Sequence, residues 1–390
     1  MIKTLASISA EPNRLVRLFL SPEHRAAADL VAQWMREAGL QVAEDALGTL
    51  RGRIGEGPRL LIGSHLDSVI DGGNYDGPLG VIAGILAVGH FGGKPPVPID
   101  VLAFGDEEGS RFPSTLSSSA ACAGAFEHDT LKLADNAGVS FADALKAYGK
   151  DFADIPKAAY APGEAAAYVE VHIEQGPLLE AENQPLGVVT GIVGQSRWRV
   201  TVTGEAGHAG TVPMNLRRDA LAGSAEMALA AERIAKAGQQ MVATVGRIEA
   251  MPGATNIIPG QVMFTVDLRC MDDAEREAAV AQFEADARRI AAARILDVKF
   301  EHFHAAAAVA CDARLQDMLA TAIGEGRRGP LRLPSGAGHD AQMMARLCPS
   351  AMMFVRCRGG ISHNPAEYAS PGDMGLAVAA LIKFIETFKP

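Results

Sequence analysis

The chain has 390 residues, of which 48% are hydrophobic and 21% are charged, a composition typical of a globular protein that buries large cores. Its formal net charge is -10, and its lysines and arginines are scattered. These two features argue against nucleic acid and against an anionic membrane surface as partners. At roughly 100–200 residues per domain, the length predicts two or three domains.

The cysteines and the chain start bear on the cellular compartment. The five cysteines are odd in number and widely spaced, with no CxxC motif, which favours neither a disulfide framework nor a cysteine-ligated zinc site. The first residues lack the apolar segment of a signal peptide, and no apolar run is long enough to span a bilayer. We therefore expect a cytoplasmic protein.

The first half of the chain predicts alternating helices and strands. Ser21 is a plausible N-cap for a helix that Gly39 ends, because Pro22 and Glu23 suit its first turn. The segment from Leu79 to Phe91 predicts a second, apolar helix. The expected strands around them are Leu60–Ile62, Val97–Phe104 and Tyr168–Val171. This alternation indicates an α/β layer with a largely parallel sheet.

A different pattern occupies the region from about residue 197 to residue 303. Two helices are expected in it, Leu216–Ala237 and Asp273–Ile295. The expected strands are Trp198–Val202, Met241–Ile248, Val262–Leu268 and Val298–Phe303. Their order is β-α-β-β-α-β, the split-βαβ arrangement that forms a two-layer domain of its own.

The alternation of apolar strands and helices resumes near the end of the chain. The predicted elements there are strand Met352–Val355 and helix Asp373–Phe388, the latter with Ser370 as its N-cap. We therefore predict an α/β catalytic domain over residues 1–190 and 305–390. A ferredoxin-like lid and dimerisation domain over residues 191–304 is expected to interrupt it.

Potential metal ligands gather where the apolar strands end, which is where open α/β sheets bind ligands. They occur in five segments: GSHLDS, GGNYDGPLG, GDEEGSRF, VHIEQG and GGISHNPAE. Adjacent carboxylates such as Asp106, Glu107 and Glu108 repel one another, and a divalent cation relieves that repulsion.

Each segment has an ordinary explanation when taken alone, such as a surface histidine or a solvated turn. Their coincidence favours a mixed nitrogen and oxygen site for Zn²⁺, Mn²⁺ or Co²⁺. Two ions bridged by one carboxylate would use all of these ligands.

The motifs in this order resemble the di-zinc aminoacylase/carboxypeptidase superfamily, in its amidase/hydantoinase/carbamoylase branch. The resemblance extends from about Arg14 to the C-terminus. It depends on SHLDS, GGNYDG, DEEGSRF, HIEQGP, GEAGHAGTVPM, PGATNIIPG, DLR, SGAGHDA and SHNPAE. It implies a phosphorylase/hydrolase-like catalytic fold and two divalent ions, zinc or else manganese or cobalt.

The resemblance also implies a role for individual residues. His65 and His172 would bind one metal, Glu108 and His363 the other, and Asp76 would bridge both. Glu107 would be the general base, and Asp67 would orient His65. His208 would stabilise the oxyanion in the partner subunit's site, so a homodimer is expected. The implied substrate-binding residues are Gln175, His208, Asn256, Arg269, Gly336, Ala337 and His339.

Some of these positions have simpler interpretations. Arg269 stands at a strand end and could pair with an acid, and His208 could be only a turn residue. His339 could simply pack against its loop. The stretch Ser114–Ser119 replaces the Gly-Ser-Arg step common in the family, which leaves one wall of the pocket undefined.

The implied activity is hydrolysis of a C–N amide bond in a linear ureido or N-carbamoyl acid. The phrases FGDEEGSRFP and FVRCRGGISHNPAE favour allantoate amidohydrolase, which releases ammonia and CO₂. N-carbamoyl-L-amino-acid hydrolase and β-ureidopropionase are the alternatives, with a dipeptidase or aminoacylase as a more distant one. A binding protein that kept the fold but lost catalysis is the alternative of another class. It should lack at least one of His65, Asp76, Glu107, Glu108, His172 and His363, and all six are present.

Overall fold

The computed structural model describes residues 1–324 and 329–390. The described chain forms two compact units. Unit 1 comprises Met1–Thr190 and Ala310–Pro390, and unit 2 comprises Gly191–Val309. Within the described residues, no helix has both the length and the apolar character to cross a membrane.

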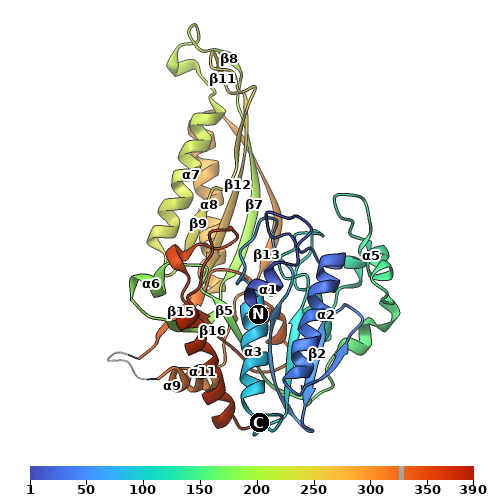
Figure 1. The fold of residues 1–390 in the computed structure, drawn as a ribbon. Helices are drawn as coiled ribbons and strands as arrows, with labels where there is room; N and C mark the ends of the chain where they lie inside the picture. The colour runs from blue at the N-terminus through green and yellow to red at the C-terminus, as the bar shows by residue number, and fades with distance from the viewer. Residues whose placement is uncertain (325–328) are drawn as a thin grey trace. The chain divides into compact units, whose positions relative to one another are not determined.

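Unit 1 is a mixed α/β layer built on a nine-stranded sheet (Figure 1). The strand order is β1-β2-β4-β3-β5-β16-β6-β14, with β15 also paired to β6. The strands are β1 (Gln41–Glu44), β2 (Leu50–Ile54), β3 (Arg59–His65), β4 (Ile99–Phe104), β5 (Ala165–Ile173), β6 (Leu186–Ile192), β14 (Val309–Ala310), β15 (Leu331–Ser335) and β16 (Ser350–Val355). The central strands β4, β3, β5 and β16 run parallel to one another, whereas β2 pairs antiparallel with β4 and β6 with β16. The mixed α/β class is confirmed, with parallel pairing among its central strands.

The helices of unit 1 cover both faces of the central strands. They are α1 (Ile2–Ala6), α2 (Pro22–Glu37), α3 (Pro78–His90), α4 (Ser117–Cys122), α5 (Phe141–Ala147), α6 (Leu178–Ala181), α9 (Ala313–Ile323), α10 (Ala341–Met344) and α11 (Pro371–Thr387). Alternate residues of β3, such as Leu60 and Ile62, join a core with α2, α3, α9 and α11. On the opposite face of β5, Glu170 accepts a hydrogen bond from the backbone N–H of Ala341, the first residue of α10. The central strands β3, β4, β5 and β16 are mostly apolar because both of their faces are buried.

The predicted caps of two helices are present. Ser21 accepts the N–H of His24 at the start of α2, and Ser370 accepts the N–H of Asp373 at the start of α11. Helix α3 contains Gly80, where a Cβ atom would lie 2.2 Å from the backbone oxygen of Val171 in β5. The glycine therefore allows α3 to approach the central sheet closely.

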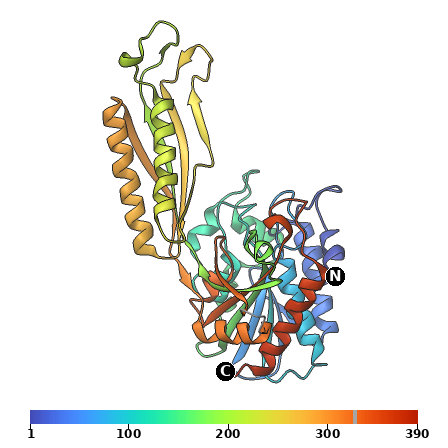
Figure 2. The ribbon, with the colours of Figure 1, turned by 90° about the vertical axis from the view of Figure 1, so that its left-hand side faces the viewer.

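Unit 2 is a sheet covered on one face by two helices that lie side by side (Figure 2). The helices are α7 (Ala220–Ala237) and α8 (Asp273–Ala293). The sheet contains β7 (Gly194–Thr203), β9 (Val242–Thr244), β10 (Ile248–Met251), β12 (Gln261–Cys270) and β13 (Asp297–Ala306). Its order is β10-β12-β7-β13, with β9 also paired to β12. The strand expected over Met241–Ile248 is two short strands, β9 and β10. A separate two-stranded sheet joins β8 (Gly207–His208) to β11 (Ile257–Ile258).

Candidate metal centre

The carboxyl ends of the central strands bring the predicted ligands together. His65 is the last residue of β3, and His172 is the second-last residue of β5. Glu107 and Glu108 follow the end of β4, and His363 lies in the loop after β16. Because these four strands are parallel neighbours, their carboxyl ends meet at one edge of the sheet.

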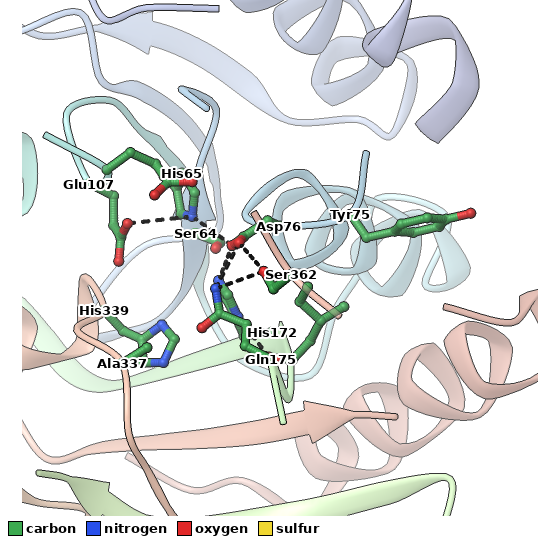
Figure 3. Close-up of polar contacts among 12 residues, drawn as sticks. Ser64, His65, Tyr75, Asp76, Glu107, His172, Gln175, Ala337, His339 and Ser362 are labelled. Carbon is green, nitrogen blue, oxygen red and sulfur yellow. Dashed lines mark hydrogen bonds and ion pairs between the residues drawn. The ribbon is translucent and has the colours of Figure 1, made fainter. Parts of the chain in front are cut away.

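A first group of ligand atoms forms around one oxygen of Asp76. Its Oδ1 lies 3.0 Å from His172 Nε2 and 3.5 Å from His65 Nε2 (Figure 3). All three side chains are buried, and the two imidazole rings stack with centroids 5.8 Å apart. Apart from these contacts with Asp76, neither imidazole Nε2 atom has a hydrogen-bond partner among the residues that the structure describes. Two imidazole nitrogens and a carboxylate oxygen that converge in this way suit a divalent ion.

A second group forms around the other oxygen of the same carboxylate. Asp76 Oδ2 lies 3.3 Å from His363 Nε2, which in turn lies 3.3 Å from Glu108 Oε2. The ligand atoms of Asp76, Glu108 and His363 all lie within 4.8 Å of one another. Asp76 thus presents a different oxygen to each group, as a carboxylate that bridges two ions would.

The electrostatics of the carboxylates differ sharply within the centre. Burial, followed by the charge of neighbouring Glu108, raises the pKa of Glu107 well above its ordinary value. Burial and the charge of Asp76 raise the pKa of Glu108 to about 7. Burial also pushes the pKa of Asp76 upward, but the contacts with His172, His363 and His65 outweigh it and hold this pKa well below the ordinary value. The shared carboxylate thus favours its ionised form, whereas the pKa values of both glutamates are shifted upward.

The pKa values of His65 and His363 are raised, which favours bound protons on their imidazole rings. Burial lowers the pKa of His65, but the charge of Glu107 and the contacts with Asp67 and Asp76 raise it well above 6.5. The contact with Asp76 raises the pKa of His363 to about 9. Divalent ions would replace these protons, since metal ligands must be deprotonated. The donor types, their convergence and their charge therefore fit a pair of divalent ions.

Glu107 stands beside the first group, where a general base is expected. Its Oε2 lies 3.9 Å from His65 Nε2. A buried carboxylate of raised pKa is suited to accept a proton and then donate it. The geometry is thus compatible with the predicted role of Glu107.

Asp67 contacts both His65 and the turn that carries Glu107 and Glu108. Its Oδ1 and Oδ2 accept the backbone N–H groups of Glu107 and Glu108 at 3.2 and 3.1 Å. His65 Nδ1 lies 3.3 Å from Asp67 Oδ1 and 3.1 Å from the Asp67 backbone oxygen. One carboxylate thereby fixes the tautomer of His65 and the turn that carries both glutamates.

Sequence reasoning did not single out Arg17, which lies behind Asp67. Its guanidinium is fully buried and donates through Nε to the Leu66 backbone oxygen at 2.6 Å, and through Nη1 to the Leu5 and Ile8 oxygens. Burial lowers its pKa to about 10, while the charge of Asp67 opposes that shift. A single arginine within an apolar segment gives no sequence signal that its guanidinium will be buried and will hydrogen-bond to backbone oxygens.

Two predicted substrate-binding positions of unit 1 lie at the centre. Gln175 donates through Nε2 to Asp76 Oδ2 at 2.7 Å. His339 is buried, its Nε2 lies 2.7 Å from Ser335 Oγ, and its ring centroid is 4.4 Å from that of His172. Burial and the charge of His172 lower the pKa of His339 well below its ordinary value. Its neutral ring, with Nδ1 unpartnered among the described residues, is thus free to meet a polar group.

The loop before His339 carries Gly336 and Ala337. Ser335 Oγ accepts the N–H of Ala337 at 3.2 Å and lies 3.1 Å from the Ala337 backbone oxygen, which closes a tight turn. Ala337 is labelled near His339 in Figure 3. The turn therefore brings this loop to the side of the centre formed by His172.

The other predicted substrate-binding residues belong to unit 2. His208 pairs with Ile257 across the β8–β11 sheet, and the Asn256 backbone oxygen accepts the N–H of Ala209. Arg269 donates through Nε and Nη2 to the two oxygens of Asp267 at 2.9 and 2.8 Å. The simpler interpretation of Arg269, an ion pair with an acid, thus describes its contact here. The substrate roles of these three residues stay predictions.

Comparison with known proteins identifies the family. The model of peptidase family M20/M25/M40 matches residues 61–387, which include every residue of both ligand groups. The chain belongs to peptidase family M20/M25/M40. Membership confirms the resemblance from the sequence motifs, and the candidate ligands thus lie in the part of the chain that defines the family.

Relatives place the chain within the M20/M25/M40 family. It is 42% identical to the allantoate deiminase of Arabidopsis thaliana, covering 98% of this chain and 80% of the relative. It is 41% identical to the N-carbamoyl-L-amino acid amidohydrolase of Geobacillus stearothermophilus, covering 97% and 94%. An amidase of the hydantoinase/carbamoylase family from Burkholderia multivorans superposes with a TM-score of 0.92 at 34% identity, covering 99% and 95%. The amidase branch predicted from the sequence is therefore confirmed.

Proposed function

We propose that this chain is a metal-dependent amidohydrolase that cleaves a C–N bond of a linear ureido or N-carbamoyl acid. The convergence of His65, Asp76, His172, Glu108 and His363 at one sheet edge carries the proposal. The substrate class comes from the relatives, whose names specify allantoate and N-carbamoyl-L-amino acids. The ions themselves are part of the proposal, with zinc, manganese and cobalt as candidates for this donor set.

The proposed mechanism assigns a task to each part of the centre. Two divalent ions bound there would polarise the substrate carbonyl and lower the pKa of water. Glu107 takes the proton of the attacking water, which its raised pKa favours, and then passes that proton to the departing nitrogen. Asp67 keeps His65 and the Glu107 turn in place.

The substrate is proposed to contact residues of both units. In unit 1, Gln175, Ala337 and His339 are proposed to bind it. In unit 2, His208 is proposed to stabilise the oxyanion, with Asn256 as a further ligand and Arg269 pairing with a substrate carboxylate. An arginine guanidinium offers a planar fork that fits a carboxylate, so this role requires Arg269 to exchange Asp267 for the substrate.

We propose allantoate as the substrate, with N-carbamoyl-L-amino acids as the second candidate. The second candidate has specific support, because the relative named for it is about as similar as the relative named for allantoate. Ammonia release from allantoate, N-carbamoyl-α-amino acids, N-carbamoyl-β-alanine and ureidoglycolate separates them. The assay is run with Mn²⁺, Co²⁺ or Zn²⁺, and no release from any compound overturns the proposal.

A variant of Glu107 tests catalysis against mere binding. Glu107→Gln should keep its metal content and lose about 10²- to 10⁴-fold in turnover, the usual contribution of a general acid or base. Glu37→Gln, at the exposed end of α2, is the control and should keep both. Undiminished turnover in Glu107→Gln contradicts the mechanism.

We further propose a homodimer, because His208 is predicted to act in the site of a partner subunit. The edge strand β10 exposes Ile248 and Met251, which are 48% and 47% accessible, as a surface that a second copy could cover. Sedimentation of the active enzyme tests this, and a fully active monomer refutes it.

A further inference from the structure

A buried carboxylate outside both ligand groups connects the two loops that supply them. Glu367, in the SHNPAE segment, is only 4% exposed. Its Oε1 accepts the backbone N–H groups of Tyr75 at 2.8 Å and Asp76 at 3.2 Å. Its Oε2 lies 3.1 Å from the hydroxyl of Ser362, the residue before His363. One side chain thereby joins the loop of the shared carboxylate to the loop of a second-group ligand.

Ser362 strengthens this connection from the other side. Its Oγ lies 2.8 Å from Asp76 Oδ2 as well as 3.1 Å from Glu367 Oε2 (Figure 3 shows the contact with Asp76). The hydroxyl has one proton, which the two carboxylates share. The distance between Asp76 and His363 is therefore held by contacts to backbone and side chain that do not involve the histidine itself.

Gly73 provides independent evidence that the first loop is shaped around Glu367. A Cβ atom at Gly73 would lie 2.2 Å from both Cδ and Oε1 of Glu367, and 2.4 Å from its Cβ. Gly73 is not among the glycines with positive φ. The glycine is therefore required for space, since any side chain at this position would displace the glutamate.

Burial of the Glu367 carboxylate beside Asp76 is not expected to stabilise the fold. Burial, and then the charge of Asp76, raise the pKa of Glu367, so one buried acid stands beside another. A residue that breaks the local rules of burial in this way is expected where function requires it.

We propose that Glu367 is a positioning residue that sets the spacing of the second ligand group, Asp76, Glu108 and His363. The inference rests on the proposed metal centre and adds to it a residue outside both ligand groups. The first group, His65, Asp76 and His172, keeps its other supports at Asp67 and at the Ile173 backbone oxygen, which His172 Nδ1 contacts at 2.9 Å. Loss of Glu367 should therefore affect the two groups unequally.

Titration of the metal-free protein with Co²⁺, followed by calorimetry, measures this inequality. The wild type should bind two ions per chain. Glu367→Ala should keep the tighter ion, held by the first group, and lose about 10- to 100-fold in affinity for the second, the usual effect of removing an outer-shell partner. Glu367→Gln should lose less than about tenfold, since its amide oxygen accepts the same backbone bonds and its nitrogen donates to Ser362.

Two further variants separate positioning from general stability. Gly73→Ala should reproduce Glu367→Ala, because its methyl group displaces the carboxylate. Asp45→Asn is the matched control: Asp45 is 7% exposed at its side chain and accepts the N–H groups of Leu47 and Thr49 in a distant loop. It should lower the melting temperature and leave both Co²⁺ affinities unchanged.

Hydrogen exchange of the metal-free protein gives a readout that needs no ion. Exchange of the Tyr75 and Asp76 amides should accelerate in Glu367→Ala and remain slow in Asp45→Asn. Two Co²⁺ affinities equal to those of the wild type in Glu367→Ala overturn the positioning role while the metal centre stands. A wild type that takes up no Co²⁺ overturns the metal centre and the positioning role together.

Discussion

Asp67→Asn directly tests the contacts that hold the turn of Glu107 and Glu108 at the proposed metal centre. The Asp67 carboxylate accepts the N–H groups of both Glu107 and Glu108. An asparagine has the same shape but only one oxygen, so its amide nitrogen must face one of these N–H groups. The variant should therefore loosen the turn after β4 while keeping the fold.

The size of the effect follows from these contacts. Loss of one hydrogen bond to an ionised acceptor costs about 1.5–3 kcal/mol. At about 1.4 kcal/mol per factor of ten, this corresponds to roughly 10- to 150-fold in Co²⁺ affinity if the cost falls on the bound state. The loss should appear at both ions, because the carboxylate of Asp67 also contacts His65, a first-group ligand.

Calorimetric titration with Co²⁺ measures the loss, and Asp45→Asn serves again as the control for removal of a buried loop cap. Wild-type affinities in Asp67→Asn would refute the reasoning, because the N–H contacts of the turn would then contribute nothing to ligand geometry. A loss confined to thermal stability would refute it as well.

Three other perturbations probe different parts of unit 1. Since the pKa of Glu108 is raised from 4.5 to about 7 and that of His363 from 6.5 to about 9, the stability from their bound protons is present at low pH and lost as pH rises through these values. The melting temperature of the metal-free protein should thus fall between pH 4.5 and about 9, and its gain on adding Co²⁺ should grow; a flat profile contradicts this. Gly80→Ala should cost about 1–3 kcal/mol or more in urea unfolding through its clash with β5. In the same helix, Gly89→Ala meets nothing nearer than 3.7 Å and should be neutral or stabilising, so equal effects would count against the packing argument. Arg17→Met should cost about 3 kcal/mol or more, because buried backbone oxygens lose charged donors, and an unchanged urea midpoint would disprove it.

The candidate metal site was predictable because the sequence places its polar residues at recognisable boundaries. His65 stands at the end of an apolar strand, Glu107 follows another within three residues, and glycines flank Asp76. In parallel neighbouring strands, such boundaries meet in space. Local patterns therefore predicted a metal site at this sheet edge, whereas the assignment of individual ligands came from the family resemblance.

The residues behind the ligands could not be predicted in the same way. Arg17 acts on the Leu66 backbone oxygen and Glu367 on the Tyr75 and Asp76 N–H groups. Backbone groups look alike at every position, so no residue type in the sequence marks a contact to them. The contact of Arg269 was also left open by the sequence, since an arginine at a strand end fits either an ion pair or a substrate-binding site.

The antiparallel edges of the unit 1 sheet show another limit. Apolar runs such as those of β4 and β16 read alike in either direction, because both faces of these strands are buried. Strand direction is set by the connections, and β2 runs antiparallel to β4 while β6 runs antiparallel to β16. The class of the fold was predictable, and the extent of its parallel part was not.

The use of both Asp76 oxygens has a consequence for the proposed pair of ions. Oδ1 faces His172 and His65, and Oδ2 faces His363. If an ion binds at each group, the one carboxylate would couple the two binding events, so that occupancy of one position would change the affinity of the other by the same factor in both directions. With two different metals, the relative affinities of the two coupled positions would then set the equilibrium distribution between them.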